Sequence, residues 1–88
     1  DRGIVICTTG IGVSMVANKV KGVRCALCRD LLSAQLTRQH NNANMLALAG
    51  GFTGNFEAEH IVDAFLTTEF EGGRHQRRVG LVMDIEQG

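Results

Sequence analysis

A cysteine followed by a glycine-containing loop is the first feature of this sequence that could carry chemistry: Cys7-Thr8-Thr9-Gly10-Ile11-Gly12. A thiol beside a helix N-terminus can have its pKa lowered from about 8.5 to about 3.5–7.5, and it can then act as a general base at neutral pH. The glycines let the backbone approach a ligand closely, and the first N–H groups of the following helix can bind an anion. On its position alone, Cys7 is more often a small buried core residue, so both interpretations stay open.

The loop is a poor match to the glycine motifs of nucleotide-binding proteins. The dinucleotide fingerprint needs a third small residue where this chain has Met15, and the Walker loop needs a Gly-Lys-Ser/Thr sequence that is absent. The loop therefore favours a ligand other than a nucleotide, and we expect no cofactor and no metal.

Two polar clusters lie where predicted helices end or begin. His40 and Asn41 close one helix; an imidazole titrates near neutral pH, so His40 either exchanges protons with a ligand or stabilises the helix C-terminus. Arg74 and Arg78 lie four residues apart on one helix face, where two guanidinium groups can hold a phosphate. Arginines at a helix N-terminus oppose its dipole, which favours a bound anion; the alternative is a solvated run of charge.

The other cysteines, Cys25 and Cys28, have the spacing of a redox or zinc motif. Residues three apart on a strand point to opposite faces about 10 Å apart, and the Cα atoms of a disulfide must come within about 7 Å. No second Cys-x-x-Cys or histidine pair completes a zinc site. We therefore expect both cysteines to be core residues, and His60, inside a long helical pattern, to lie on the surface.

Apolar patterns predict the elements that position these residues: strands over residues 3–8, 23–28 and 45–48, and helices over residues 14–20, 31–40, 55–70 and 74–86. Asp30 is a suitable N-cap, and Gly22 is a suitable stop for the first helix. The order β-α-β-α-β-α-α, with short connections, predicts an α/β fold, a Rossmann-like three-layer α/β/α domain with a parallel sheet. In such a sheet, ligands bind beyond the carboxyl ends of the strands.

The composition restricts the partners and the setting of the chain. Its 88 residues carry nine basic and nine acidic side chains, so a basic nucleic-acid binder is not expected. There is no apolar run of membrane-spanning length and no export signal, and an odd count of three cysteines favours a reducing cytoplasm. A three-stranded parallel sheet leaves open edges, and a core of this size is marginal. We therefore expect a partner subunit or a further part of the fold.

Taken together, these segments resemble the class B ribose-5-phosphate isomerases and the related galactose-6-phosphate isomerase subunits. The match is carried, in order, by ICTTGIGVS (residues 6–14) with ANK (17–19), SAQLTRQHN (33–41), IVDAFL (61–66) and EGGRHQRRV (71–79). Each motif alone is weak, but the combination is specific, and it runs over nearly the whole chain.

The resemblance implies a metal-free isomerase that interconverts ribose 5-phosphate and ribulose 5-phosphate, acting as a homodimer or dimer of dimers with its site between subunits. By resemblance, Cys7 is the base, Thr9 with the loop amides stabilises the enediolate, and His40 is the second proton-transfer residue. The implied substrate-binding residues are Thr8, Gly10, Ile11, Gly12, Asn41, Arg74 and Arg78. A six-carbon sugar phosphate (galactose or allose 6-phosphate), or a catalytically inactive module that binds phospho-sugars, is the alternative.

The chain departs from the family pattern in three ways. The family usually has glycine where Thr8 stands, which matters if that position needs a positive φ. It also tends to carry a basic residue at the position of Gly51. The N-terminal half of such a protein, which holds an Asp-His pair, has no counterpart here, so the chain is expected to be a C-terminal portion.

Overall fold

Three parallel strands form the centre of the computed structural model, which describes all 88 residues. They are β1 (Gly3–Cys7), β2 (Cys25–Leu27) and β3 (Met45–Ala49), and β3 lies between the other two. All pairs are parallel, so the carboxyl ends of the strands meet at one edge of the sheet, as the alternating order predicts.

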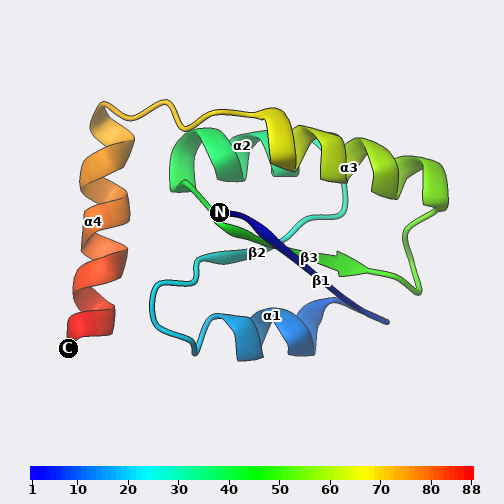
Figure 1. Ribbon diagram of the computed structural model, residues 1–88, viewed down its shortest axis with the longest axis horizontal. Helices are drawn as coiled ribbons and strands as arrows, with labels where there is room; N and C mark the ends of the chain where they lie inside the picture. Colours follow the sequence, from blue (N-terminus) through cyan, green and yellow to red (C-terminus); the bar gives the residue numbers. More distant parts are fainter.

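Helices cover both faces of this sheet and give the expected three layers (Figure 1). The helix α1 (Ile11–Ala17) lies on one face, and α2 (Leu31–Asn41) and α3 (Asn55–Thr67) lie on the other. The last helix, α4 (Arg74–Gln87), stands across the end from which the strands start and packs against α2. None of the four helices combines the length and apolar character that crossing a bilayer requires.

The core lies between the central strand and the helix pair α2–α3. Leu46 and Leu48 of β3 are buried against Ile61 and Phe65 of α3. Because helices cover β3 on both faces, its sequence is a continuous apolar run rather than an alternating one. The core therefore fixes α2, and with it the turn that follows α2.

Of the two other cysteines, which were both expected in the core, only Cys28 lies there. Cys28 is 1% exposed in the core, whereas Cys25 is half-buried on β2, and neither forms a disulfide. Burial raises the pKa of both thiols. Both are therefore protonated at neutral pH and serve as packing residues, and His60 is exposed on α3 as expected.

The first helix lies three residues earlier than its apolar pattern predicts. It begins at Ile11 because Gly10, with φ 76°, turns the chain sharply after β1. It ends at Ala17, and the side chain of the next residue, Asn18, bonds to the backbone of β2. Its Oδ1 accepts from the N–H of Cys25 at 2.7 Å, and its Nδ2 donates to the Cys25 carbonyl at 2.9 Å. The strand predicted over 23–28 shortens to three residues.

Two further boundaries differ from expectation. Gly22 is not the stop of the first helix; it lies in the following turn, where its N–H donates to the Glu86 carboxylate at 2.9 and 3.0 Å. The third helix ends at Thr67 rather than at residue 70, and Arg2 donates to the carbonyls of Phe65 and Leu66 in its last turn. Both places make hydrogen bonds to side chains distant in sequence, which no local pattern reveals.

Candidate active site

The loop after β1 is shaped by a single glycine. Gly10 is buried with a left-handed φ of 76°, and an added Cβ would collide with Cδ1 of Leu27 and come within 3.1 Å of the Leu48 carbonyl group. Only glycine adopts this φ and fits this space without strain. The turn at Gly10 directs the start of α1 back toward Cys7, which is half-buried at the end of β1.

Backbone N–H groups of this loop surround the Cys7 thiol and lower its pKa. The largest contribution comes from the N–H of Val13, in the first turn of α1, and the N–H groups of Gly10 and Thr9 add to it against an opposing effect of burial. The Thr9 hydroxyl contributes in the same direction. Because the first N–H groups of a helix have no acceptor within it, they are free to stabilise a thiolate. The local geometry therefore favours a reactive thiol over an inert core cysteine.

The loops at this edge continue the pairing of β1 with β3. The N–H of Gly50 donates to the Cys7 carbonyl at 2.8 Å, and that of Gly51 donates to the Thr8 carbonyl at 2.9 Å. A Cβ at Gly51 would lie 2.7 Å from Cγ2 of Thr8, so the threonine methyl fills the space beside this glycine. Asn42 is the only non-glycine residue with positive φ, so Thr8 occupies the loop without left-handed strain.

His40 and Asn41 lie in the last turn of α2, ahead of a tightly bonded turn. Asn42 ends the helix with φ 48°. Its side-chain oxygen accepts from Arg38 at 2.9 Å, and its carbonyl accepts two bonds from Arg24, at 2.8 and 3.2 Å. Arg38 is 4% exposed, so the bonds that it makes are shielded from water. The turn thereby fixes the position of His40.

A second histidine packs on His40. The rings of His40 and His75 stack with centroids 4.2 Å apart and an interplanar angle of 14°. His75 is 7% exposed, and its Nε2 lies 3.6 Å from Oε1 of Glu71. Desolvation, with the nearby His40 and Arg74, lowers the pKa of His75. No role is predicted for His75 from the sequence; the signal that could have found it is its spacing of four from Val79 on the buried face of α4.

Arg74 and Arg78 lie on the first turns of α4, beside this pair of histidines. Both are exposed, and neither forms a salt bridge within the chain. The first turn of α4 contains no acidic residue, and no side chain caps its N-terminus. The positive charges are thus uncompensated, which is the arrangement expected where an anion binds.

The predicted site residues therefore form two clusters at opposite ends of the sheet. Cys7 pairs with Ala49 at the carboxyl edge, whereas the helix carrying His40 leads into Met45 at the other edge (Figure 1). The length of β3 separates these edges by about 13 Å. Thr8, Thr9, Gly10, Ile11 and Gly12 follow Cys7 in the loop and the start of α1. Asn41, Arg74 and Arg78 lie at the end of α2 and the start of α4, where His40 stacks on His75, and the two clusters do not join within one chain.

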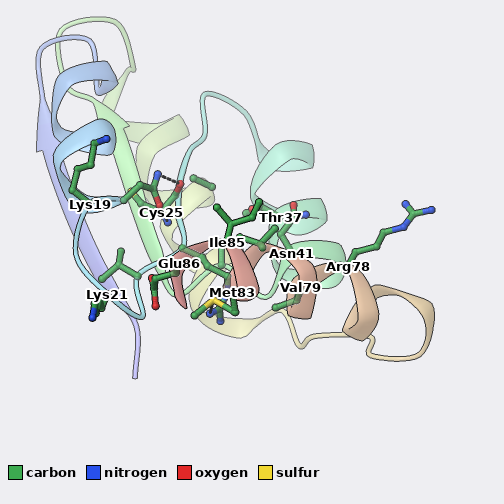
Figure 2. A pocket seen from close by; sticks show the side chains of 16 residues that line it. Lys19, Lys21, Cys25, Thr37, Asn41, Arg78, Val79, Met83, Ile85 and Glu86 are labelled. Carbon is green, nitrogen blue, oxygen red and sulfur yellow. Dashed lines mark hydrogen bonds between the residues drawn. The ribbon is translucent and has the colours of Figure 1, made fainter. Parts of the chain in front are cut away.

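A cavity of about 630 Å³ opens between α4, β2 and the end of α2 (Figure 2). Its floor is apolar and includes Val79, Met83 and Ile85 of α4. Asn41 and Arg78 lie on its rim, but the Arg78 side chain points away from it (Figure 2), and no residue of the Cys7 cluster lines it. The cavity is therefore separate from the site at Cys7.

Comparison with known proteins identifies the family. The family model described as Ribose/Galactose Isomerase matches residues 1–82. The chain belongs to the ribose/galactose isomerase family. This agrees with the resemblance carried by the Cys7 loop, the His40 segment and the Arg74–Arg78 helix.

Individual members of the ribose/galactose isomerase family match the chain over nearly its whole length. A putative sugar phosphate isomerase of Bacillus subtilis is 55% identical over 87 residues, and the ribose-5-phosphate isomerase B of Escherichia coli is 51% identical over 87 residues. Each alignment covers 99% of this chain and 58% of the relative. The crystal structure of ribose-5-phosphate isomerase B from Mycoplasma genitalium, with bound ribulose-5-phosphate, superposes with a TM-score of 0.96 at 53% identity, over 99% of this chain and 57% of that one. The chain thus spans somewhat more than half the length of these relatives.

Proposed function

We propose that the protein is an aldose–ketose isomerase that interconverts ribose 5-phosphate and ribulose 5-phosphate through an enediolate. The observation that carries the proposal is the Cys7 thiol, whose pKa is lowered by backbone N–H groups at the open end of a strand. The similarity to ribose-5-phosphate isomerases B at about half identity supports the choice of substrate. The three free cysteines support a cytoplasmic setting.

In this proposal, the Cys7 thiolate removes the proton from C2 of the open-chain aldose and returns it to C1. The electron pair of the C2–H bond forms the enediolate, whose negative charge on oxygen is stabilised by Thr9 and the amides of residues 10–12. The second transfer takes the O2 proton to O1, and His40 carries it. Reprotonation at C1 gives the ketose, and Cys7 ends the cycle as the thiolate, so atoms and charge balance.

The phosphate is held by the second cluster. Arg74 and Arg78 offer two planar guanidinium groups that no carboxylate of the chain neutralises. Asn41, adjacent to His40, is the amide that contacts the sugar. With the phosphate held by the arginines, C1 and C2 at the other end of the sugar lie where both His40 and a thiol can reach them.

The separation of the clusters supports a site built from two copies of the chain, as a homodimer or a dimer of dimers. One copy supplies Cys7 and its loop, and the other supplies His40 and the arginines. Leu81, Val82 and Ile85 leave α4 with an exposed apolar face beside the cavity of Figure 2. A second copy that covered this face would bury apolar area and complete the site in one step.

The direct test is metal-free conversion of ribose 5-phosphate to ribulose 5-phosphate by the 88-residue chain, beside the Cys7→Ala variant. We expect turnover that the variant lacks. Turnover that survived in Cys7→Ala would exclude Cys7 as the base, and binding of ribose 5-phosphate without turnover by the unaltered chain would favour a phospho-sugar-binding module instead.

Mixing two inactive variants tests the composite site. Cys7→Ala and His40→Asn chains, each inactive alone, would form mixed dimers in which one of the two sites is unaltered. An equal mixture is therefore expected to recover about a quarter of the native activity, because half of the dimers are mixed. A mixture as inactive as its components would refute the shared site while leaving the chemistry of Cys7 untouched.

A further inference from the structure

Three metal-ligating side chains from three segments meet at the junction of α2 and α4, remote from the Cys7 loop. They are His40 in the last turn of α2, Glu71 in the loop after α3, and His75 in the first turn of α4. One ligand atom from each, two imidazole nitrogens and a carboxylate oxygen, all lie within 4.8 Å of one another. One of these approaches, between Nε2 of His75 and Oε1 of Glu71, is 3.6 Å.

The backbone holds these residues together independently of their side chains. The N–H of Glu71 donates to the carbonyl of Gln39 at 3.1 Å, directly beside His40. The N–H of His75 donates to the Gly72 carbonyl at 3.0 Å and closes the turn between the loop and α4. His75 is buried and held in place, whereas Glu71 is exposed and its carboxylate can adjust. The backbone thus holds the three residues close together, and the side chains of Glu71 and His40 are the ones that adjust.

The donor set points to a particular class of ion. Two imidazoles and one carboxylate, with a position left for water, form a common zinc site with Zn–N distances of about 2.0–2.1 Å. Tetrahedral geometry then requires donors about 3.4 Å apart, so a pair at the 4.8 Å limit has to close by about 1.4 Å through rotation of the His40 and Glu71 side chains. Hard ions such as Mg²⁺ need several oxygen ligands, and this cluster has a single carboxylate.

We propose that His40, Glu71 and His75 form a binding site for Zn²⁺. Coordination occupies a ring nitrogen of His40 and separates the two stacked imidazoles. If the proposed isomerase function holds, Zn²⁺ is therefore an inhibitor of that activity rather than a cofactor, because a coordinated His40 nitrogen cannot carry a proton. The site itself does not depend on that function.

The test is a titration of Zn²⁺ against the 88-residue chain in competition with a chromophoric chelator. A Cys7→Ser background removes the half-buried thiol of lowered pKa as a competing ligand. We expect one equivalent of Zn²⁺ to bind, and the affinity to fall by about tenfold or more in His75→Gln and in Glu71→Gln, since losing even an outer-shell partner costs that much. His60→Gln and Glu57→Gln, which alter exposed residues of α3, are the matched controls and should leave the affinity unchanged.

The outcomes separate the site from its alternatives. Circular dichroism of each variant identifies one that has merely unfolded. If His75→Gln unfolds, the Zn²⁺ affinity of Glu71→Gln, which alters an exposed side chain, tests the site. No stoichiometric binding, or equal affinity in Glu71→Gln and in the unaltered cluster, overturns the proposal. Because the titration needs no turnover, an absence of isomerase activity leaves its result intact, and an absence of Zn²⁺ binding leaves the isomerase proposal intact.

Discussion

The contact between Thr8 and Gly51 predicts that these two positions are energetically coupled. A methyl group at residue 51 would lie 2.7 Å from Cγ2 of Thr8 and 3.1 Å from the Thr8 carbonyl oxygen. The first distance is about 0.7 Å short of ordinary contact, and the backbone cannot give way freely because the Gly51 N–H is bonded to that same carbonyl. Relief must therefore come from the Thr8 side chain or from the loop that carries it.

The magnitude follows from two opposing effects of Gly51→Ala. Overpacking of this kind costs about 1–3 kcal/mol, whereas replacing glycine at a position without positive φ stabilises by about 0.4–1 kcal/mol through the unfolded chain. We expect Gly51→Ala to lower the free energy of unfolding by about 1 kcal/mol. In a Thr8→Ser background the methyl is absent, so the same change should be nearly neutral, which makes the coupling energy about 1 kcal/mol.

Urea denaturation of the four proteins of this double-mutant cycle measures the coupling. The rate of Cys7 alkylation, measured in parallel, reports whether the loop beside Thr8 has moved, and it should return to its original value in the double variant. Gly80→Ala is the control of opposite sign: it lies inside α4 with no atom near an added Cβ, so it should stabilise by about 0.5–1 kcal/mol. A coupling energy below about 0.3 kcal/mol would mean that the methyl contact does not govern this loop.

Three further predictions concern the thiol, the buried histidine and the turn after β1. The pH midpoint of Cys7 alkylation should lie below that of an ordinary thiol. Val13→Pro removes the N–H that lowers the Cys7 pKa most, at a first-turn position where a helix tolerates proline, so it should raise this midpoint. An unchanged midpoint would contradict the role of the Val13 N–H. Burial lowers the pKa of His75, so the unfolded chain binds more protons, and the free energy of unfolding should decline as the pH falls below about 6.5. His75→Gln should flatten this decline in urea titrations, and His60→Gln should not. Gly10→Ala should destabilise by at least about 2 kcal/mol, since left-handed strain and overpacking add, and a thermal midpoint equal to that of the unaltered chain would rule this out.

Much of the fold could be predicted because its signals are local. The apolar run of β3 and the Asp30 cap, whose carboxylate accepts from the N–H of Ser33 at 2.7 Å, depend only on residues near in sequence. The ends of α1 and α3 were less predictable, since Asn18 and Arg2 determine them through hydrogen bonds to residues that come close only in the folded chain. Local sequence patterns therefore predict which helices and strands form, whereas some of their boundaries involve contacts that only the folded chain makes.

For the site, the sequence by itself determined which side chains have the right chemistry: a cysteine before a turn that requires glycine, a histidine at a helix end and two arginines on one helix face. Their division into two clusters also follows from chain order, because in parallel β-α-β units strands end at one edge of the sheet and helices end at the other. Only the tertiary structure decided that His75 stacks on His40, that Glu71 completes their cluster and that the Thr8 methyl lies against Gly51. These are contacts between segments distant in sequence, and packing, which no local periodicity encodes, sets their geometry.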